Sequence, residues 1–340
     1  MSAKIKFVII GCGHIGKRHA LMVERNPEAQ LVGMVDVNED LKPDIEATFK
    51  VPFFNNIAAL FASNLAIDVI NICTPNNEHA PQSILALKHG CHVVCEKPMA
   101  LSKQECDEVI NTSLQASKHV FCVMQNRYSP PSVWLKEMIT QGILGNIYMV
   151  QINCYWNRDD RYYKPGSWKG NQQIDGGTLF TQFSHFIDIM YWLFGDISNI
   201  TAKFNDFNHQ KLTEFEDSGI VSFDFVNGGM GSINYSTAVW DTNLESSIII
   251  IGENGSVKVG GQYMNEVRYC HIKDYVMPAL AEGSPANDYG FYKGSAANHH
   301  FVIENVVDTL LGKTTATTNV LEGSKVVEII ERIYSLKTNV

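Results

Sequence analysis

Residues 6–16 read KFVIIGCGHIG, a short β-branched run followed by three glycines in the pattern G-x-G-x-x-G. The run predicts a strand, and the segment after it predicts a helix. Between a strand and a helix, Gly11 allows a tight turn, Gly13 lets a pyrophosphate approach the backbone, and Gly16 lets the helix pack closely on the strand. This context predicts a dinucleotide-binding loop at the helix N-terminus, with a glycine turn that binds nothing as the alternative.

An acidic residue follows the second predicted strand, at 31–35. Asp36 lies 20 residues after Gly16, the spacing at which dinucleotide-binding folds place a carboxylate on the ribose. A carboxylate there accepts hydrogen bonds from both ribose hydroxyls and repels a 2′-phosphate, and no arginine follows at 37–38. We therefore expect NAD rather than NADP as the cofactor.

The first third of the chain alternates predicted strands with predicted helices. Further strands are expected at 67–73, 92–95 and 119–124, and helices at 78–89 and 103–116. These strands are largely apolar, as in a parallel sheet that is buried on both faces. We expect an α/β Rossmann domain with a doubly wound parallel sheet over residues 1–125.

The pattern changes after about residue 126, where longer strands alternate apolar and polar residues. Strands are expected at 146–155, 219–225 and 246–251, hairpin turns at 227–229 and 253–255, and helices at 133–141, 298–311 and 320–336. This predicts an α+β domain over 126–340 with a largely antiparallel open sheet, its C-terminal helix packing back near the first domain. An open sheet face needs cover, so we expect a homodimer or homotetramer formed through this sheet.

Composition excludes several classes of protein. The net charge is −9 and Lys and Arg do not cluster, which argues against a nucleic-acid partner. No apolar run approaches the roughly 20 residues that span a bilayer, so no membrane partner is expected. The opening residues lead into a predicted strand without the apolar segment of a secretory leader. Eight scattered cysteines contain no C-x-x-C pair, so we predict no disulfide framework, no metal site and a cytoplasmic location.

Two more strand ends carry polar residues. Residues 91–98 read CHVVCEKP, which puts Lys97 where a parallel strand ends and therefore near a bound cofactor. An exposed ion pair with Glu96 is the alternative, and the bond to Pro98 can be cis or trans. Residues 73–79 read CTPNNEH, either a wall of the cofactor cleft or a loop with a helix cap.

These motifs together resemble the Gfo/Idh/MocA family of oxidoreductases. G-x-G-x-x-G, T-P-x-x-x-H and E-K-P occur in that order, each at a successive strand end. The resemblance implies a Rossmann domain, an α+β substrate domain, and hydride transfer between a nicotinamide and a sugar, cyclitol or related alcohol. It makes Lys97 the active-site lysine. The implied cofactor-binding residues are Gly11, Gly13, His14, Ile15, Gly16, Asp36, Thr74, Pro75, His79, Glu96, Lys97 and Asn126.

A second family signature has the form G-G-x-L-x-D-x-x-x-H-x-x-D. Residues 176–188 read GGTLFTQFSHFID, so His185 matches the catalytic histidine while Thr181 stands where many members carry aspartate. Thr181 or Gln182 is then a candidate to contact the substrate. Without the resemblance, a core histidine on an apolar helix is the favoured reading of His185.

The resemblance narrows to a subgroup on residues 125–128 (QNRY), 155–158 (YWNR), 162–163 (YY), 168–170 (WKG), 287–292 (NDYGFY) and 298–300 (NHH). The chain is similar to bacterial dehydrogenases that oxidise the 3-hydroxyl of UDP-N-acetylglucosamine or its uronate in surface-polysaccharide biosynthesis. Aromatic side chains can stack on sugar or base faces, and arginines can clamp a carboxylate or pyrophosphate. The alternatives are an aromatic core without nucleotide specificity, a myo-inositol or free-sugar dehydrogenase, and a non-catalytic NAD-binding regulator. The implied substrate-binding residues are Lys97, Arg127, Tyr128, Arg158, Tyr163, Thr181, Gln182 and His185.

The expected mechanism divides acid–base work between two residues. His185 removes the hydroxyl proton as general base, because an imidazole titrates near about pH 6.5. Lys97 hydrogen-bonds the same oxygen and stabilises its alkoxide character. The reverse assignment, with Lys97 as the base, stays open.

Overall fold

The computed structural model describes residues 4–337 and divides the chain into two compact units. The first comprises Met1–Met124 and His299–Val327, the second Gln125–Asn298 and Glu328–Val340. Residues 1–3, part of the opening segment considered above, lie outside the described range. The sequence predicted one boundary after residue 125. The chain instead returns to the first unit, because helix α9 (His299–Leu310) packs against helix α1 (His14–Arg25).

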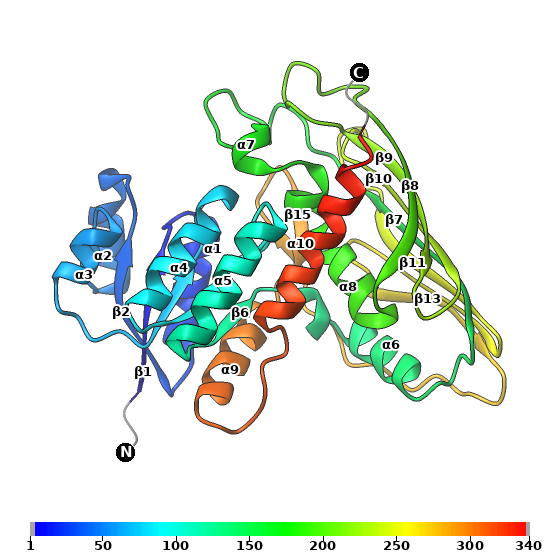
Figure 1. Ribbon diagram of the computed structural model, residues 1–340, viewed down its shortest axis with the longest axis horizontal. Coiled ribbons are helices and arrows are strands. Elements are labelled where there is room, and N and C mark those ends of the chain that lie inside the picture. The colour runs from blue at the N-terminus through cyan, green and yellow to red at the C-terminus, as the bar shows by residue number, and fades with distance from the viewer. Residues whose placement is uncertain (1–3, 338–340) are drawn as a thin grey trace. The chain divides into compact units, whose positions relative to one another are not determined.

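The first unit is built on a six-stranded parallel sheet in the order β3-β2-β1-β4-β5-β6 (Figure 1). This order is typical of dinucleotide-binding folds, in which the ligand lies where the strand order reverses, here between β1 and β4. The predicted Rossmann fold is confirmed. The strands are β1 (Ile5–Ile10), β2 (Ala29–Val35), β3 (Phe53–Phe54), β4 (Val69–Ile72), β5 (His92–Cys95) and β6 (Val120–Cys122).

Helices connect these strands. Helix α5 (Lys103–Ala116) begins at the predicted residue because Ser102 and Glu105 form a capping box. Strand β3 was not predicted, because its two residues leave no readable pattern. The remaining helices of this unit are α2 (Lys42–Phe49), α3 (Ile57–Ala62), α4 (His79–Lys88) and the first part of α10 (Val320–Tyr334), with 3-10 turns η1 (Glu39–Leu41) and η2 (Asn76–Glu78).

The second unit contains a seven-stranded sheet in the order β13-β12-β11-β7-β10-β9-β8. Only β10 and β7 run parallel among the described neighbours, which confirms a largely antiparallel sheet. Both predicted hairpin turns join neighbouring strands. The strands are β7 (Ile147–Tyr155), β8 (Ile197–Asn205), β9 (Ser218–Phe225), β10 (Met230–Ser236), β11 (Glu245–Gly252), β12 (Gly255–Gly260) and β13 (Glu266–Ile272).

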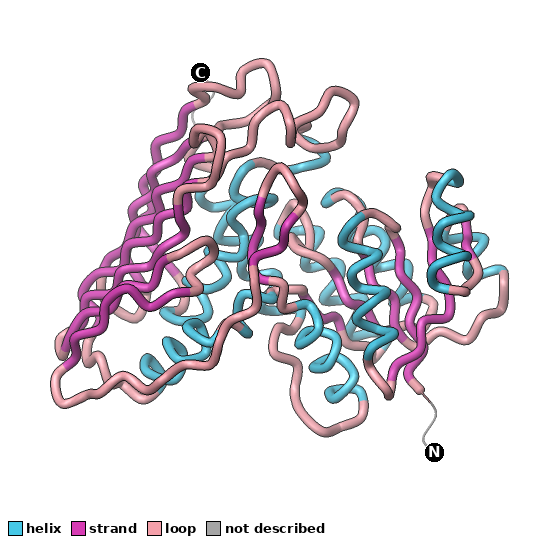
Figure 2. Tube along the Cα trace, turned by 180° about the vertical axis from the view of Figure 1, so that it is seen from behind, coloured by secondary structure: helices cyan, strands magenta, loops and turns pink. Residues whose placement is uncertain are grey.

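Helices cover one face of this sheet, as Figures 1 and 2 show. In β9, buried Val221, Phe223 and Phe225 alternate with exposed Ile220 and Asp224. The remaining elements of this unit are η3 (Gln125–Tyr128), α6 (Pro130–Thr140), α7 (Gln172–Asp175), π-helical η4 (Leu179–Phe183), α8 (Ser184–Phe194) and the pair β14 (Ala286–Asp288) and β15 (Lys293–Ala296). Among residues 4–337, no helix is both long and apolar enough to cross a membrane.

Candidate active site

The glycine loop fits a bound dinucleotide. Gly11 has φ +90°, and a Cβ there would lie 2.5 Å from the carbonyl oxygen of Cys73; one at Gly16 would lie 1.7 Å from that of Gly11. The chain itself therefore requires both glycines. A Cβ at Gly13 would meet no atom within 4 Å. Gly13 instead leaves open space beside the N-terminus of α1, as an approaching pyrophosphate needs.

Asp36 is held in place at the end of β2. Its Oδ2 accepts a hydrogen bond from the Cys12 amide at 2.6 Å, and its Oδ1 accepts one from Asn38 at 2.9 Å. Each carboxylate oxygen has a second lone pair, so Asp36 can still accept bonds from two ribose hydroxyls. The carboxylate is half-buried beside the glycine loop, where NAD fits and a 2′-phosphate would be repelled.

The end of β4 is tied to the end of β5 by a histidine. The two ring nitrogens of His79 lie 2.9 Å from the carbonyl oxygen of Thr74 and 2.6 Å from that of Pro98. Burial lowers the pKa of His79, although both carbonyls oppose that shift. His79, predicted to contact the cofactor, is 1% exposed and joins the ends of these two strands. Thr74 and Pro75 are half-buried, and the Thr74 hydroxyl donates to Gln82 at 2.9 Å.

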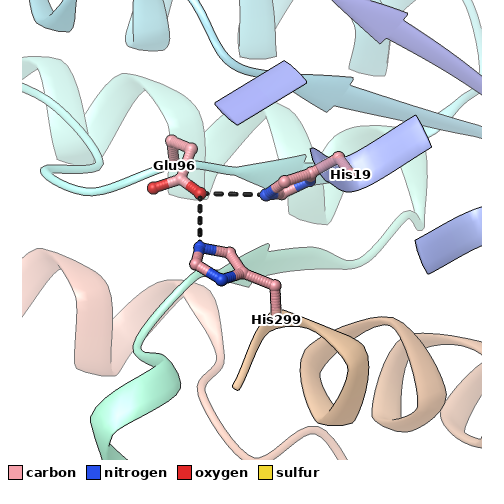
Figure 3. Close-up of side chains that lie close together, drawn as sticks. All are labelled: His19, Glu96 and His299. Carbon is pink, nitrogen blue, oxygen red and sulfur yellow. Dashed lines mark hydrogen bonds and ion pairs between the residues drawn. The ribbon is translucent and has the colours of Figure 1, made fainter. Parts of the chain in front are cut away.

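Lys97 follows β5 directly, is half-buried, and is joined to Pro98 by a cis peptide bond. Glu96, whose exposed ion pair with Lys97 was the alternative, is buried, and its carboxylate turns into the unit. There its Oε1 lies 2.9 Å from Nε2 of His19 and 3.6 Å from Nε2 of His299 (Figure 3). Glu96, for which the sequence predicted cofactor contact, is 8% exposed. Its carboxylate holds the end of β5 through the two histidines inside the first unit.

The Glu96 cluster has a defined protonation pattern. The Asn71 amide nitrogen, which can only donate, lies 3.0 Å from Nδ1 of His19. Nδ1 therefore accepts, and Nε2 of a neutral His19 donates to Glu96. Burial opposes ionisation of Glu96, but hydrogen bonds from His19 and His299 outweigh it and hold its pKa well below the usual value. Two histidines and a carboxylate also form a donor set that zinc accepts, yet 2.9 Å is a hydrogen-bond separation.

In the second unit, a turn of two glycines leads to the predicted histidine. Gly176 and Gly177 have φ +86° and +123°, and a Cβ at Gly177 would lie 2.8 Å from the Tyr334 hydroxyl oxygen. That hydroxyl accepts a hydrogen bond from the Leu179 amide at 2.8 Å. The π-helical turn η4 follows, a distortion that is frequent at functional sites.

His185 lies in the first turn of α8 and is 3% exposed. Its Nε2 is 3.2 Å from the side-chain nitrogen of Gln125. Because an amide nitrogen can only donate, Nε2 accepts in this arrangement, and a nitrogen that accepts is one that can take a proton. Thr181, at the position where relatives carry aspartate, donates its hydroxyl hydrogen bond to the fully buried carboxylate of Asp175.

Two predicted substrate ligands are buried against neighbouring side chains. Arg127 is 1% exposed, and its Nε and Nη2 donate to the carboxylate of Asp188 at 2.9 and 2.6 Å. Arg127 is thus a buried cation that has a counter-ion of its own. Tyr163 is 3% exposed, in a cluster with Tyr162 and Phe215, so its ring is core.

The other predicted residues differ in how far they are buried. In η3, Tyr128 is half-buried and Asn126 is buried, with its Oδ1 accepting from the Ala296 amide at 3.3 Å. Arg158 is 2% exposed, and its Nε donates to Oε1 of Gln182 at 2.7 Å. Gln182 therefore connects Arg158 to the segment that carries Thr181 and His185. Of the predicted nucleotide-loop residues, His14 is exposed and Ile15 half-buried.

Two family models match the chain. One, described as the oxidoreductase family with an NAD-binding Rossmann fold, covers residues 5–124, and the Gfo/Idh/MocA C-terminal domain covers residues 133–258. The chain belongs to the Gfo/Idh/MocA family.

Solved structures of the family share nearly the whole fold. The WlbA dehydrogenase from Bordetella pertussis, in complex with NADH and UDP-GlcNAcA, is 30% identical over 98% of this chain and 96% of its own, with a TM-score of 0.88. The WlbA dehydrogenase from Chromobacterium violaceum, with the same ligands, is 29% identical over 99% of this chain and 94% of its own, with a TM-score of 0.89.

A curated relative is the glucose-6-phosphate 3-dehydrogenase of Bacillus subtilis, 29% identical over 59% of this chain and 57% of its own length. Together these similarities define a Gfo/Idh/MocA enzyme with NAD as its cofactor and a sugar-type alcohol as its substrate class.

Three residues of the second unit escaped the prediction: Gln125, Lys169 and Asp175. Asp175 directly precedes the glycine pair, so its place in the signature was a usable signal. Gln125 and Lys169 gave no such signal. Gln125 pairs with His185, 60 residues away, and Lys169 contacts the aromatic ring of Tyr162.

Proposed function

We propose that this enzyme oxidises the 3-hydroxyl of a UDP-N-acetylhexosamine or its uronate. The observation that carries the proposal is the similarity over nearly the full chain to two dehydrogenases solved with NADH and UDP-GlcNAcA. The Bacillus relative, a 3-dehydrogenase by name, supports oxidation at the same carbon. The subgroup resemblance supports a role in surface-polysaccharide biosynthesis.

In the proposed mechanism His185 takes the proton of the substrate hydroxyl on Nε2, the nitrogen that accepts from Gln125. Lys97 donates a hydrogen bond to the same oxygen and stabilises its growing negative charge. Asp36 and the backbone around Gly13 hold the cofactor. NAD, when bound, supplies the hydride acceptor.

A substrate panel tests the assignment. Purified protein is incubated with NAD and, separately, UDP-N-acetylglucosamine, its uronate, glucose 6-phosphate, glucose and myo-inositol, and NADH absorbance is recorded. We expect turnover of a UDP-sugar at a kcat/KM at least about tenfold above that of every free sugar. Preference for inositol or a free sugar would replace the proposed substrate, and NAD binding without any turnover would favour the regulator.

Two variants test the catalytic roles. Lys97→Met and His185→Ala should each lower kcat by about 10²- to 10⁴-fold, the usual contribution of a positioned acid–base group. Both should bind NADH with the wild-type Kd, measured by fluorescence titration. Lys118→Met, in a loop of the same unit as Lys97, is the control for loss of a lysine. Near-normal turnover of Lys97→Met, or an unchanged pH–rate profile of His185→Ala, contradicts the respective role.

The uncovered face of the second-unit sheet supports a homodimer or homotetramer. Ile220 and Met230 are exposed there on neighbouring strands. Light scattering measures the mass of the particle, and an Ile220→Lys variant should shift it toward the monomer.

A further inference from the structure

Arg158 is a buried cation whose partners are all neutral. Its Nε donates to Gln182 at 2.7 Å, Nη1 to the carbonyl oxygen of Asn157 at 2.6 Å, and Nη2 to that of Lys293 at 3.1 Å. Its guanidinium carbon lies 4.7 Å from the ring centre of Trp156 and 4.8 Å from that of Tyr292. These contacts satisfy hydrogen bonds and fix the side chain, but none brings a negative charge.

A second cation lies against the same aromatic rings. The Lys169 ammonium nitrogen is 3.9 Å from the ring centre of Tyr162 and 5.7 Å from that of Tyr292. The ammonium N–H groups of Lys169 make no hydrogen bond within residues 4–337. Tyr162 also lies under Arg158, at 5.2 Å, so both cations share one aromatic wall.

The nearby carboxylates leave these charges unpaired. Neither Arg158 nor Lys169 forms an ion pair with a described residue. Asp175, the acidic group whose field reaches Lys169, accepts hydrogen bonds from the Gly170 amide and from Thr181. A buried and a half-buried positive charge without an anion are unfavourable, and a bound anion would offset that cost.

The surroundings are suited to a ligand. Partners of Arg158, among them Asn157, Asn243 and Lys293, line a cavity of about 270 Å³ together with Tyr292. Gln182, bonded to Arg158 and through its nitrogen to the Tyr162 hydroxyl at 2.8 Å, precedes His185 by one helical turn. The two cations are thus connected to the segment that carries the proposed base.

We propose that Lys169, backed by Arg158 and walled by Tyr162 and Tyr292, binds an anionic oxygen group of the substrate. The inference rests on the proposed function and deepens it, because a uronate carboxylate and a diphosphate both present such oxygens. Lys169 supplies the free N–H donors, whereas Arg158, whose donors are engaged, supplies charge and orients the rings. A bound anion would also give specificity, since a neutral sugar leaves the cations unpaired.

The subsite should weaken at alkaline pH. Burial and then the charge of Arg158 lower the pKa of Lys169 to about 8. Burial raises the pKa of Tyr162, which faces Lys169, to about 12, and Arg158 stays protonated. Lys169 is therefore the member of this cluster that loses its charge near pH 8. Anion affinity should fall as the pH rises through about 8, and Lys169→Met should remove that dependence.

The test measures binding by calorimetry on the NAD-loaded protein, with UDP-N-acetylglucosamine uronate, UDP-N-acetylglucosamine and glucose 6-phosphate as probes. Lys169→Met should weaken anion binding about 10- to 100-fold, the range of a hydrogen bond to a charged group. Lys169→Arg, which keeps the charge, should recover part of the affinity. The control is Lys164→Met, an exposed lysine of the same segment.

The probes separate the two sources of the anion. Weaker binding of the uronate alone assigns the subsite to the carboxylate, and equal weakening of both UDP-sugars assigns it to the diphosphate. If wild type turns over no UDP-sugar but Lys169→Met still weakens one of the three anions, the subsite stands and the proposed substrate fails. Wild-type protein that binds none of them, or a Lys169→Met change below twofold for all, overturns the subsite.

Discussion

The glycine loop of the first unit and the Arg158–Lys169 cluster of the second unit are built in opposite ways. The loop is made of backbone. Gly11 is required by the carbonyl oxygen of Cys73, which follows β4, and Gly16 by that of Gly11. The cluster is made of side chains from separate segments of the chain, such as Arg158, Gln182 and Tyr292. Backbone sites leave a motif in the sequence, whereas side-chain sites leave only isolated residues.

The largest expected effect separates two glycines of the loop. Gly16→Ala should prevent stable folding of the first unit, because its Cβ would lie 1.7 Å from a backbone oxygen that cannot move away alone. Gly13→Ala has no such contact and should fold normally, with its melting temperature within about 2 °C of wild type. It should bind NADH at least about tenfold more weakly. Thermal unfolding and NADH fluorescence titration measure the two effects.

The pair of variants distinguishes structure from ligand. If Gly13→Ala were destabilised as much as Gly16→Ala, Gly13 would be needed by the fold and not by the pyrophosphate. Wild-type NADH affinity in Gly13→Ala would contradict the cradle directly.

The sequence predicted the first unit well because parallel strands bring their carboxyl ends to one edge. That rule located Asp36 and Lys97 without knowledge of any contact between them. It could not show that Glu96 turns inward, since the partner His299 comes from a segment that follows Gln125–Asn298 of the second unit. Periodicity likewise placed α9 and α10 but not the unit to which each belongs.

The second unit was predicted in outline only. Alternation of apolar and polar residues and the hairpin turns gave its sheet, but side-chain burial decided its site. Arg127 and Arg158 looked alike as potential anion ligands. The structure separates them, because Arg127 has Asp188 as a buried counter-ion and Arg158 has no described one. The π-helical turn before His185 also had no readable pattern, since it depends on the glycine pair and Tyr334.

The next effect in size tests that difference between the arginines. Asp188→Ala should destabilise the protein by about 3–5 kcal/mol, because it leaves the fully buried Arg127 guanidinium without its counter-ion. The double variant Arg127→Met with Asp188→Leu removes both charges and should recover most of that loss. Urea unfolding measures the free energies. A loss in the double variant as large as in Asp188→Ala would mean that packing, not the buried charge, sets the cost.

The smallest expected effect is a dependence of stability on pH through Lys169. Burial lowers its pKa to about 8 in the folded protein from the ordinary lysine value of 10.5. Between these values the unfolded state binds more protons, so folding is favoured as the pH rises through this window. Lys169→Met should therefore raise the melting temperature most below pH 8, by roughly 2–4 °C for about 1 kcal/mol. The advantage should shrink toward pH 10.5.

Lys164→Met, from the same segment but exposed, should show no such trend, and melting curves from pH 7 to 10.5 compare the two variants. Equal behaviour of the two would mean that Lys169 is solvated like any surface lysine. Its ammonium would then carry no unfavourable charge for an anion to neutralise. A gain in stability on losing Lys169, together with a loss of anion affinity, is what a residue kept for binding rather than for folding should show.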